Sequence, residues 1–522
     1  MLKGSSKNGL FSRKLSIHYI PRLFKSCSVR AASSSSSMLG VFTEKLDTIA
    51  PSFKIQGSKI KIISSPKEFY KIIKSKLLRA EKRIFLSTLY IGVTEHELIS
   101  TIQTSLRLKP DLKLYILTDA LRGTRESPSS SCASLLVPLI TEFGDERIEI
   151  RMYHTPNLTG LKKCLIPRRI NEGWGLQHMK LYGFDDEIII SGANLSSDYF
   201  TNRQDRYHLF SSRDITNYFF QLYVTISRLS FLVSPNSRSL NEYRLEWPTS
   251  NLAPSPLASP SHYIYESSKV LKQMPMPKKN INFTEKLDTL DTVIYPIVQL
   301  KPLSCHFDSS TEFSALKLIL STLTSTCYHN SSWTFTAGYF NPTQALTELL
   351  LSTSSSSNTV ITASPWANGF YGSNGVSGLI PSAYTFLLNR FLRIIQQKNR
   401  TKDITVKEWR RGTVGEPDGW TYHAKGIWIS LGRENRQVKS EVDISVIGSS
   451  NYTKRSYSLD LEAGVIILTN NLNLKKQLAK ERDALEENAK NISINELSIP
   501  ERKVGLKVRL AMWIVSTVGG AL

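Results

Sequence analysis

The chain has 522 residues and a mass of 58.9 kDa, too long for one ordinary hydrophobic core, so two or more domains are expected. Its 66 Lys and Arg residues against 44 Asp and Glu give a net charge of +22, which favours anionic partners such as nucleic acid, an acidic membrane or phosphorylated substrates. The five cysteines are scattered without CxxC spacing and indicate neither a disulfide framework nor a zinc site. No apolar run is long enough to predict a membrane-spanning helix.

The N-terminal segment, residues 1–40, has the composition of a mitochondrial presequence. It contains seven basic residues and no acid, with many serines and spaced apolar side chains. The alternative is a disordered basic tail. Removing these seven charges from +22 leaves +15, so the rest of the chain is predicted to be strongly basic as well.

Two strand–helix–strand units follow, in the same order in each half of the chain. Short apolar, β-rich runs flank a segment with helical periodicity in both units. This order predicts parallel sheets covered by helices, and hence an α/β fold with two pseudo-symmetric lobes and an active site between them. The predicted elements are strand 82–92, helix 95–106 and strand 112–119, then strand 331–340, helix 343–351 and strand 358–364.

Composition also predicts the domain boundaries. A first lobe is expected over 41–234 and a second over 301–522, ending in a helical tail. Between them, 235–300 is rich in Pro and Ser and is predicted to be a linker or crossing segment. Residues 472–491 have the charge pattern of an exposed helix. The apolar tail 510–522 either packs on the core or enters a membrane interface.

Residues with catalytic potential occur twice, in the same arrangement. Each half has a His-x-Lys motif, then an Asn, then an acid eleven residues after the Asn. The distance from His to Asn is 16 residues in the first half and 28 in the second, where a polar insertion at 432–443 is predicted to be a hairpin loop. The two sets are His178, Lys180, Asn194 and Asp205, and His423, Lys425, Asn451 and Glu462.

One such set is suited to holding a phosphate group. On a strand, His and Lys two residues apart point to the same face, and Lys and Asn donate hydrogen bonds to phosphate oxygens. The acid is predicted to accept from the second nitrogen of the imidazole in its own unit. Two sets would place two histidines on opposite sides of one phosphorus, one attacking it and the other acting as acid and then base. No metal or cofactor is predicted, because an adjacent ammonium repels a cation.

The doubled pattern resembles the phospholipase D superfamily, whose motifs are HxKxxxxD and G-[GS]-x-N. His178, Lys180 and Asp185 match the first motif, and Gly448, Ser449 and Asn451 match the second. The first half departs from the pattern with SGAN at 191–194, and the second half has Ser430 where the first has Asp185. The departures put a catalytic role of Asp185 in question and leave both His-Lys-Asn sets intact.

Within this superfamily the chain is most similar to the mitochondrial phosphatidylglycerophosphate synthases, through residues 51–70, 191–207 and 420–426. The resemblance implies transfer of a phosphatidyl group from CDP-diacylglycerol to sn-glycerol 3-phosphate with release of CMP, a step toward phosphatidylglycerol and cardiolipin. It also implies a peripheral position at the matrix face of the inner membrane. By the same resemblance, His178 is the nucleophile and His423 the acid and base, although the residues alone do not order them.

The acceptor carries a second phosphate that needs cations of its own. Four basic residues directly after the two Asn residues are the candidates, and the alternative is that they are solvated surface charges: Arg203, Arg206, Lys454 and Arg455. Ser449 of the second motif is also expected to contact substrate.

Three other functions stay open from the residues alone. Another phosphatidyltransferase or lipase of the superfamily would use serine, phosphatidylglycerol or water as the acceptor. A nuclease of the same fold is compatible with the basic charge, although nucleic acid is the less expected partner. A membrane-surface binding protein without activity would have no need for two intact His-x-Lys motifs. Candidate membrane contacts are 370–381, 510–522 and the basic faces, and the sequence does not predict the oligomeric state.

Overall fold

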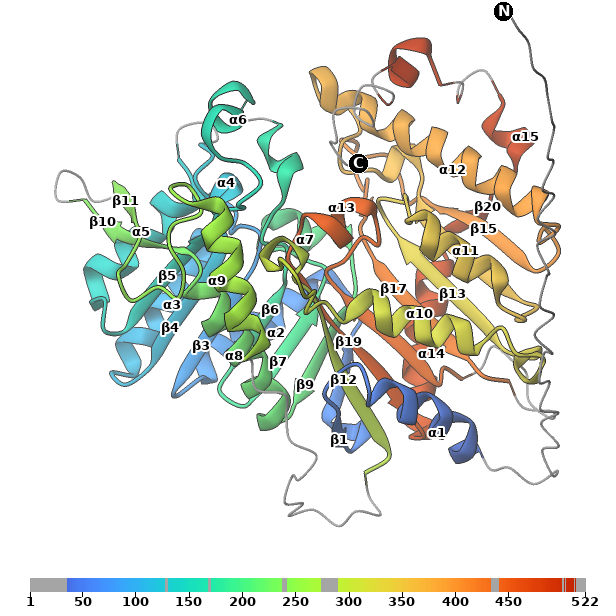
Figure 1. Cartoon of the computed structure of the whole chain (residues 1–522), viewed down its shortest axis with the longest axis horizontal. Helices are drawn as coiled ribbons and strands as arrows, with labels where there is room; N and C mark the ends of the chain where they lie inside the picture. The colour runs from blue at the N-terminus through green and yellow to red at the C-terminus, as the bar shows by residue number, and fades with distance from the viewer. Residues whose placement is uncertain are drawn as a thin grey trace, which may run out of the picture.

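The computed structural model describes residues 35–126, 130–167, 170–236, 242–273, 290–432, 441–499, 502, 504–510 and 512. Two lobes lie side by side, each built around a nine-stranded sheet with helices packed against it (Figure 1). The predicted presequence, residues 1–40, lies outside the described residues except for its last part, where helix α1 begins at Ser35.

The first lobe contains a sheet in the order β11-β10-β5-β4-β3-β6-β7-β9-β2. Its strands are β2 (Ile60–Ile63), β3 (Arg83–Ser87), β4 (Lys113–Asp119), β5 (Ile148–Tyr153), β6 (Leu181–Phe184), β7 (Glu187–Ser191), β9 (Tyr207–Ser211), β10 (Phe231–Pro235) and β11 (Tyr243–Glu246). The main helices are α2 (Pro66–Arg79), α3 (His96–Leu108), α5 (Cys132–Phe143), α8 (Arg213–Ser227) and α9 (Pro260–Lys272). Ser65 caps α2 by accepting from the Glu68 N–H, and Pro66 fills the first helical position.

The second lobe contains a sheet in the order β1-β12-β19-β18-β17-β13-β14-β15-β20. Its strands are β1 (Phe53–Ile55), β12 (Thr292–Gln299), β13 (Ser332–Ala337), β14 (Asn358–Ala363), β15 (Ile404–Trp409), β17 (Lys425–Ser430), β18 (Ile444–Gly448), β19 (Glu462–Thr469) and β20 (Ala489–Asn491). The main helices are α1 (Ser35–Leu46), α10 (Glu312–Thr322), α11 (Gln344–Ser352), α12 (Ile380–Gln397) and α14 (Leu472–Glu486).

The two predicted strand–helix–strand units are confirmed as β3-α3-β4 and β13-α11-β14, and in both the strands pair in parallel. The wider prediction of parallel sheets is wrong. Most strand pairs are antiparallel, because the His-x-Lys segments continue into hairpins: β6 pairs with β7, and β17 with β18. The β17–β18 hairpin confirms the loop predicted at 432–443, most of which lies outside the described residues.

The boundaries of the lobes differ from those predicted. Most of the segment 235–300 is folded: β11 and α9 belong to the first lobe, and β12 pairs with β19 in the second. Residues 35–55 belong to the second lobe, where α1 buries Phe42 and Leu46 and β1 pairs with β12. Apolar residues spaced along α1 explain this, since they need a core to cover them.

The lobes share a continuous core. Ile188 and Ile190 of β7 pack in one buried cluster with Ile447 of β18 and Val465 of β19. Helix α14, predicted to be exposed, lies at this junction and buries Lys475 completely, where it pairs with Asp443. The prediction of an exposed helix failed because α14 buries long charged side chains, and their partners lie far away in the sequence.

Candidate active site

Each histidine of the two motifs is bound by the opposite lobe. His178 precedes β6, and its backbone N–H donates to the carbonyl oxygen of Leu461, at 2.9 Å. Its Nδ1 lies 2.9 Å from Oε2 of Glu462, the first residue of β19. Ser449 donates its hydroxyl to the same carboxylate oxygen and so fixes the carboxylate. The predicted substrate contact of Ser449 stays a prediction, and the structure shows its hydroxyl bound to Glu462.

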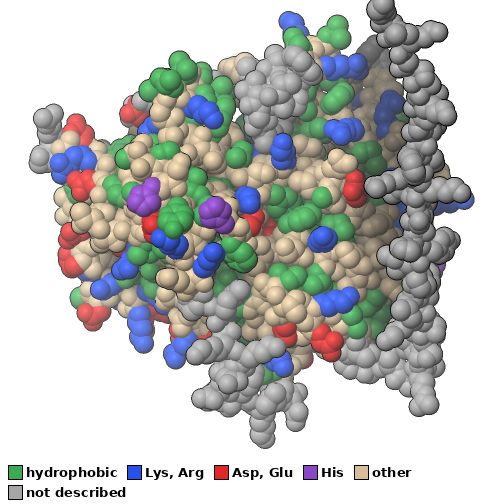
Figure 2. Space-filling model, in the orientation of Figure 1, with side chains coloured by type: hydrophobic (Ala, Val, Ile, Leu, Met, Phe, Trp, Pro, Cys, Tyr) green, Lys and Arg blue, Asp and Glu red, His purple; other side chains and the backbone are tan. Residues whose placement is uncertain are grey.

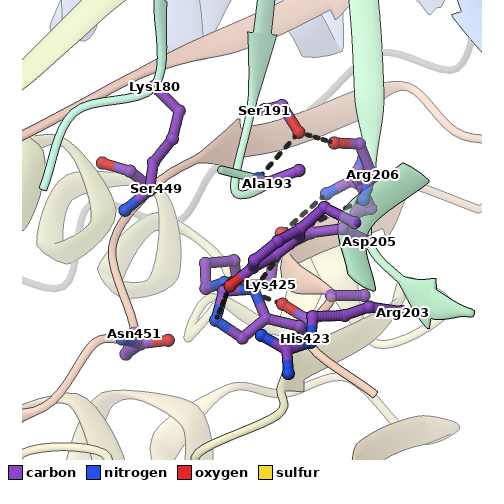
Figure 3. Close-up of polar contacts among 12 residues, drawn as sticks. Lys180, Ser191, Ala193, Arg203, Asp205, Arg206, His423, Lys425, Ser449 and Asn451 are labelled. Carbon is purple, nitrogen blue, oxygen red and sulfur yellow. Dashed lines mark hydrogen bonds and ion pairs between the residues drawn. The ribbon is translucent and has the colours of Figure 1, made fainter. Parts of the chain in front are cut away.

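The second histidine repeats this arrangement with the lobes exchanged. The backbone N–H of His423 donates to Gln204 O at 2.8 Å, and its Nδ1 lies 2.7 Å from Asp205 Oδ2. Lys425 Nζ lies 2.8 Å from Nδ1 and 3.7 Å from the carboxylate (Figure 3). Because an ionised carboxylate only accepts, Nδ1 carries the proton and Nε2 keeps its lone pair.

The prediction that each acid orients the histidine of its own unit is therefore wrong. The structure crosses the pairs, His178 with Glu462 and His423 with Asp205. The reason lies in the backbone: β8 (Arg203–Gln204) pairs in parallel with β16 (Thr421–Tyr422) of the other lobe, which brings Asp205 next to His423. Neither lobe alone contains a complete pair.

The glycine of SGAN is required by this close packing. A Cβ at Gly192 would lie 2.7 Å from Asp205 Oδ1 and 2.9 Å from Lys425 Nζ, so a side chain there would displace both charged groups. The flanking Ser191 donates to the carbonyl oxygen of Arg206 and accepts from the Ala193 N–H, which fixes the turn (Figure 3).

Burial sets the protonation of the site. It lowers the pKa of His178 and of His423 well below the ordinary value, and the neighbouring Lys180 and Lys425 lower both further. Both imidazoles are therefore neutral near pH 7 and available as a nucleophile or base. Burial also raises the pKa of Glu462 to about 7, so about half of this group is protonated at pH 7 and more of it at lower pH.

The two asparagines occupy different surroundings. Asn194 donates from Nδ2 to the hydroxyl of Tyr199, at 3.2 Å. Asn451 keeps a buried side-chain oxygen without a hydrogen-bond partner, an arrangement that a bound ligand would satisfy. Lys180 is fully buried and donates to His178 O at 2.6 Å.

Two tyrosines beside His423 were missed by the sequence interpretation. Tyr199 Oη lies 3.4 Å from His423 Nε2, and the rings of Tyr199 and Tyr339 meet the imidazole edge-on, with centroids at 5.2 and 5.5 Å. Tyr199 follows Asn194 by five residues within the passage 191–207, so its place near the site could have been predicted from the sequence. Tyr339 follows β13 and could be placed only from the three-dimensional structure.

Asp185 does not lie with the imidazoles. It occupies the turn between β6 and β7 at a φ of 52° and accepts from the backbone N–H groups of Glu81, Lys82 and Arg83. Its role in the structure is to hold the turn before β3. The catalytic assignment of Asp185 is corrected accordingly.

The four candidate cations separate into distinct environments. Arg206 is buried and donates to Val446 O and Glu481, so it joins the lobes and is withdrawn as an acceptor-binding residue. Lys454 is exposed. Arg203 lies over the ring of Tyr199, and Arg455 pairs with Asp460. Arg203 depresses the pKa of His423 and Arg455 that of His178, so each lies near one imidazole.

Within the described ranges, no three His, Cys, Asp or Glu side chains are grouped to hold a metal ion. Across the same ranges, no helix has the length and apolar character needed to cross a membrane.

Relatives of the chain identify its family. The chain is 44% identical over 488 residues to a CDP-diacylglycerol–glycerol-3-phosphate 3-phosphatidyltransferase of Saccharomyces pastorianus, covering 93% of each protein. It is 33% identical to the human mitochondrial enzyme of that name, over 88% of this chain and 83% of the relative. This chain belongs to that family. The predicted family and the predicted enzyme class, a phosphatidyltransferase, are confirmed.

The fold has a solved counterpart. Phosphatidylserine synthase of Haemophilus influenzae superposes with a TM-score of 0.69 at 17% identity, covering 92% of this chain and 97% of that one. This supports the predicted class of two pseudo-symmetric α/β lobes. A comparison with models of protein families finds no match.

Proposed function

We propose that this chain transfers the phosphatidyl group of CDP-diacylglycerol to sn-glycerol 3-phosphate, releasing CMP and forming phosphatidylglycerophosphate. The observation that supports this most directly is the pair of buried, neutral imidazoles, each held through Nδ1 by a carboxylate of the opposite lobe. The names of relatives at 44% and 33% identity specify both substrates. The names of the vertebrate relatives support a mitochondrial location, and we place the enzyme as a peripheral protein at the matrix face of the inner membrane.

In the first step, Nε2 of His178 attacks the phosphatidyl phosphorus. The bond from this phosphorus to the CMP oxygen breaks. The negative charge of the bound substrate favours uptake of a proton from solvent at Nε2 of His423, which then donates this proton to CMP as it leaves. In the second step, His423 takes the proton of an acceptor hydroxyl, which attacks the phosphohistidine and displaces His178. Lys180, Lys425, Asn194 and Asn451 stabilise the charge on the phosphate oxygens in both steps.

Glu462 and Asp205 orient the two imidazoles and fix the tautomer that leaves Nε2 unprotonated. Arg203 and Arg455 are the remaining candidates for the acceptor phosphate, since both lie near an imidazole and keep part of the side chain exposed, 13% and 25%. Loss of one charged hydrogen bond, about 1.5–3 kcal/mol, should raise the KM for sn-glycerol 3-phosphate about 10- to 100-fold in Arg203→Gln or Arg455→Gln. The control is the exposed Lys454→Gln, and equal changes in the KM for CDP-diacylglycerol would contradict the assignment.

The test of the function is CMP release from CDP-diacylglycerol in detergent with EDTA, with and without sn-glycerol 3-phosphate. We expect release that depends on the acceptor and is lost in His178→Ala and in His423→Ala. Release without the acceptor would identify a hydrolase, and absence of release would reject the proposal.

A further inference from the structure

Two short helical segments, one in each lobe, share the pattern Gly-Leu-Lys-x-x-Leu. They are α6 (Gly160–Leu165), with the sequence GLKKCL, and residues 505–510, with the sequence GLKVRL. The leucines of each pair are four residues apart and so lie on one helical face. The exposed fractions are 80% for Leu161, 77% for Leu165, 82% for Leu506 and 59% for Leu510. Among the described residues, the first three are the most exposed large hydrophobic side chains.

Both segments project from the same edge of the molecule. In Figure 1, α6 stands at the top of the first lobe, and residues 505–510, in dark red, at the top of the second. The segment α6 follows the C-terminal end of β5, and the chain then returns to His178. Gln177 donates its N–H to Asp119 at the C-terminal end of the parallel strand β4. The active site therefore lies toward the edge that carries the leucines.

This edge is also basic. The chain has no acid in residues 150–171, 349–402 or 502–522, which include α6, α12 and the 505–510 segment. Green and blue side chains stand among tan surface on both upper projections in Figure 2. Beside the 505–510 segment lies a cavity of about 820 Å³. Its lining combines apolar side chains such as Phe386 and uncharged polar ones such as Asn389 with three arginines, Arg390, Arg393 and Arg509. Such a cavity suits an anionic headgroup with an apolar body.

We propose that this edge docks on the surface of an anionic phospholipid bilayer, with both leucine pairs entering the acyl boundary and the flanking Lys and Arg side chains at the phosphates. Exposed leucines are favourable only when a partner removes them from water, and the basic flanks select an anionic surface. Two contacts, one from each lobe, would set the active site facing the bilayer. The inference rests on the proposed function, since a lipid substrate has to be taken from a membrane.

The test is sedimentation of the full chain with vesicles of phosphatidylcholine alone and of phosphatidylcholine with phosphatidylglycerol. Loss of two leucines should weaken binding to the anionic vesicles at least about tenfold, in both Leu161→Ser/Leu165→Ser and Leu506→Ser/Leu510→Ser. The matched control is Leu78→Ser/Leu108→Ser, which removes leucines that are 44% and 70% exposed at the ends of α2 and α3. Both leucines lie shortly before the N-terminal ends of β3 and β4, at the end of the sheet opposite to the docking edge. The two positions are close in space, because Lys109, next to Leu108, donates to the carbonyl oxygen of Leu78.

The expected result is weak binding to neutral vesicles, loss of anionic binding in both leucine variants, and unchanged binding of the control. CMP release in detergent should persist in the leucine variants and fall only with vesicle substrate. Unchanged binding in both leucine variants, or equal binding to neutral and anionic vesicles, would overturn the inference while leaving the function intact. An inactive wild type in detergent would reject the function, and the vesicle result would still decide the docking edge.

Discussion

The two halves of the site hold the same residue types in different ways. On the His178 side, Glu462 faces the imidazole with both oxygens, at 2.9 and 3.0 Å, and is itself held by Ser449. On the His423 side, Lys425 contacts the imidazole and Tyr199 reaches Nε2. A nitrogen that exchanges protons benefits from such a hydrogen-bonding neighbour, whereas an attacking nitrogen needs free access to phosphorus. The difference supports assigning attack to His178 and proton transfer to His423.

The largest expected effect follows from this asymmetry. His178→Ala and His423→Ala should each lower the rate by about 10⁴-fold or more, because each residue acts in both steps. Labelled phosphatidyl groups should accumulate on the enzyme only in His423→Ala, after denaturation at alkaline pH. Label on His178→Ala instead would mean that the two roles are reversed.

The crossed carboxylates should give the next effect. Glu462→Gln and Asp205→Asn are each expected to lower kcat by on the order of 10³–10⁴-fold, since the amide has no negative charge and its NH₂ group can donate to Nδ1, which favours the wrong tautomer. In ¹⁵N spectra of labelled histidine, Glu462→Gln should shift the signals of His178 and Asp205→Asn those of His423. The opposite pattern would contradict the crossing. Asp185→Asn serves as the control and should affect stability, by about 1–3 kcal/mol, rather than kcat.

The acidic side of the pH profile should distinguish the halves further. The pKa of Glu462 is raised to about 7 by burial, so below pH 7 this group gains a proton and stops accepting from His178. We expect kcat/KM to fall about tenfold per pH unit on this side. This fall of kcat/KM below pH 7 should be absent in Glu462→Gln. If the fall persists in that variant, another titrating group causes it.

The smallest effect concerns the phenol beside His423. Tyr199→Phe keeps the ring packing and removes the hydroxyl that lies 3.4 Å from His423 Nε2 and accepts from Asn194 Nδ2, so kcat should fall about three- to tenfold. Tyr70→Phe, which removes a surface hydrogen bond to Glu97, is the control. A Tyr199→Phe enzyme with full kcat would show that the phenol only fills space.

The residues of each half-site were predictable because their spacing is local. Alternation along a strand places His423 and Lys425 together, and the repetition of His, Lys, Asn and acid made the set recognisable in both halves. The same local patterns predicted β3-α3-β4 and β13-α11-β14 correctly. Asp185 was misplaced because a motif match gives a position in the chain and not the direction in which a turn presents its carboxylate.

The pairing of these groups depends on contacts between lobes. Strands β8 and β16 are separated by more than two hundred residues, and only their pairing places Asp205 on His423. The burial of Arg206 depends likewise on its ion pair with Glu481 of α14. Tyr339 meets His423 only because the chain after β13 approaches the site. The sequence by itself therefore determined which chemical groups each lobe supplies, since residue type and short-range periodicity are local properties. The tertiary structure alone decided which groups meet, because long-range packing of the two sheets sets every distance across the site.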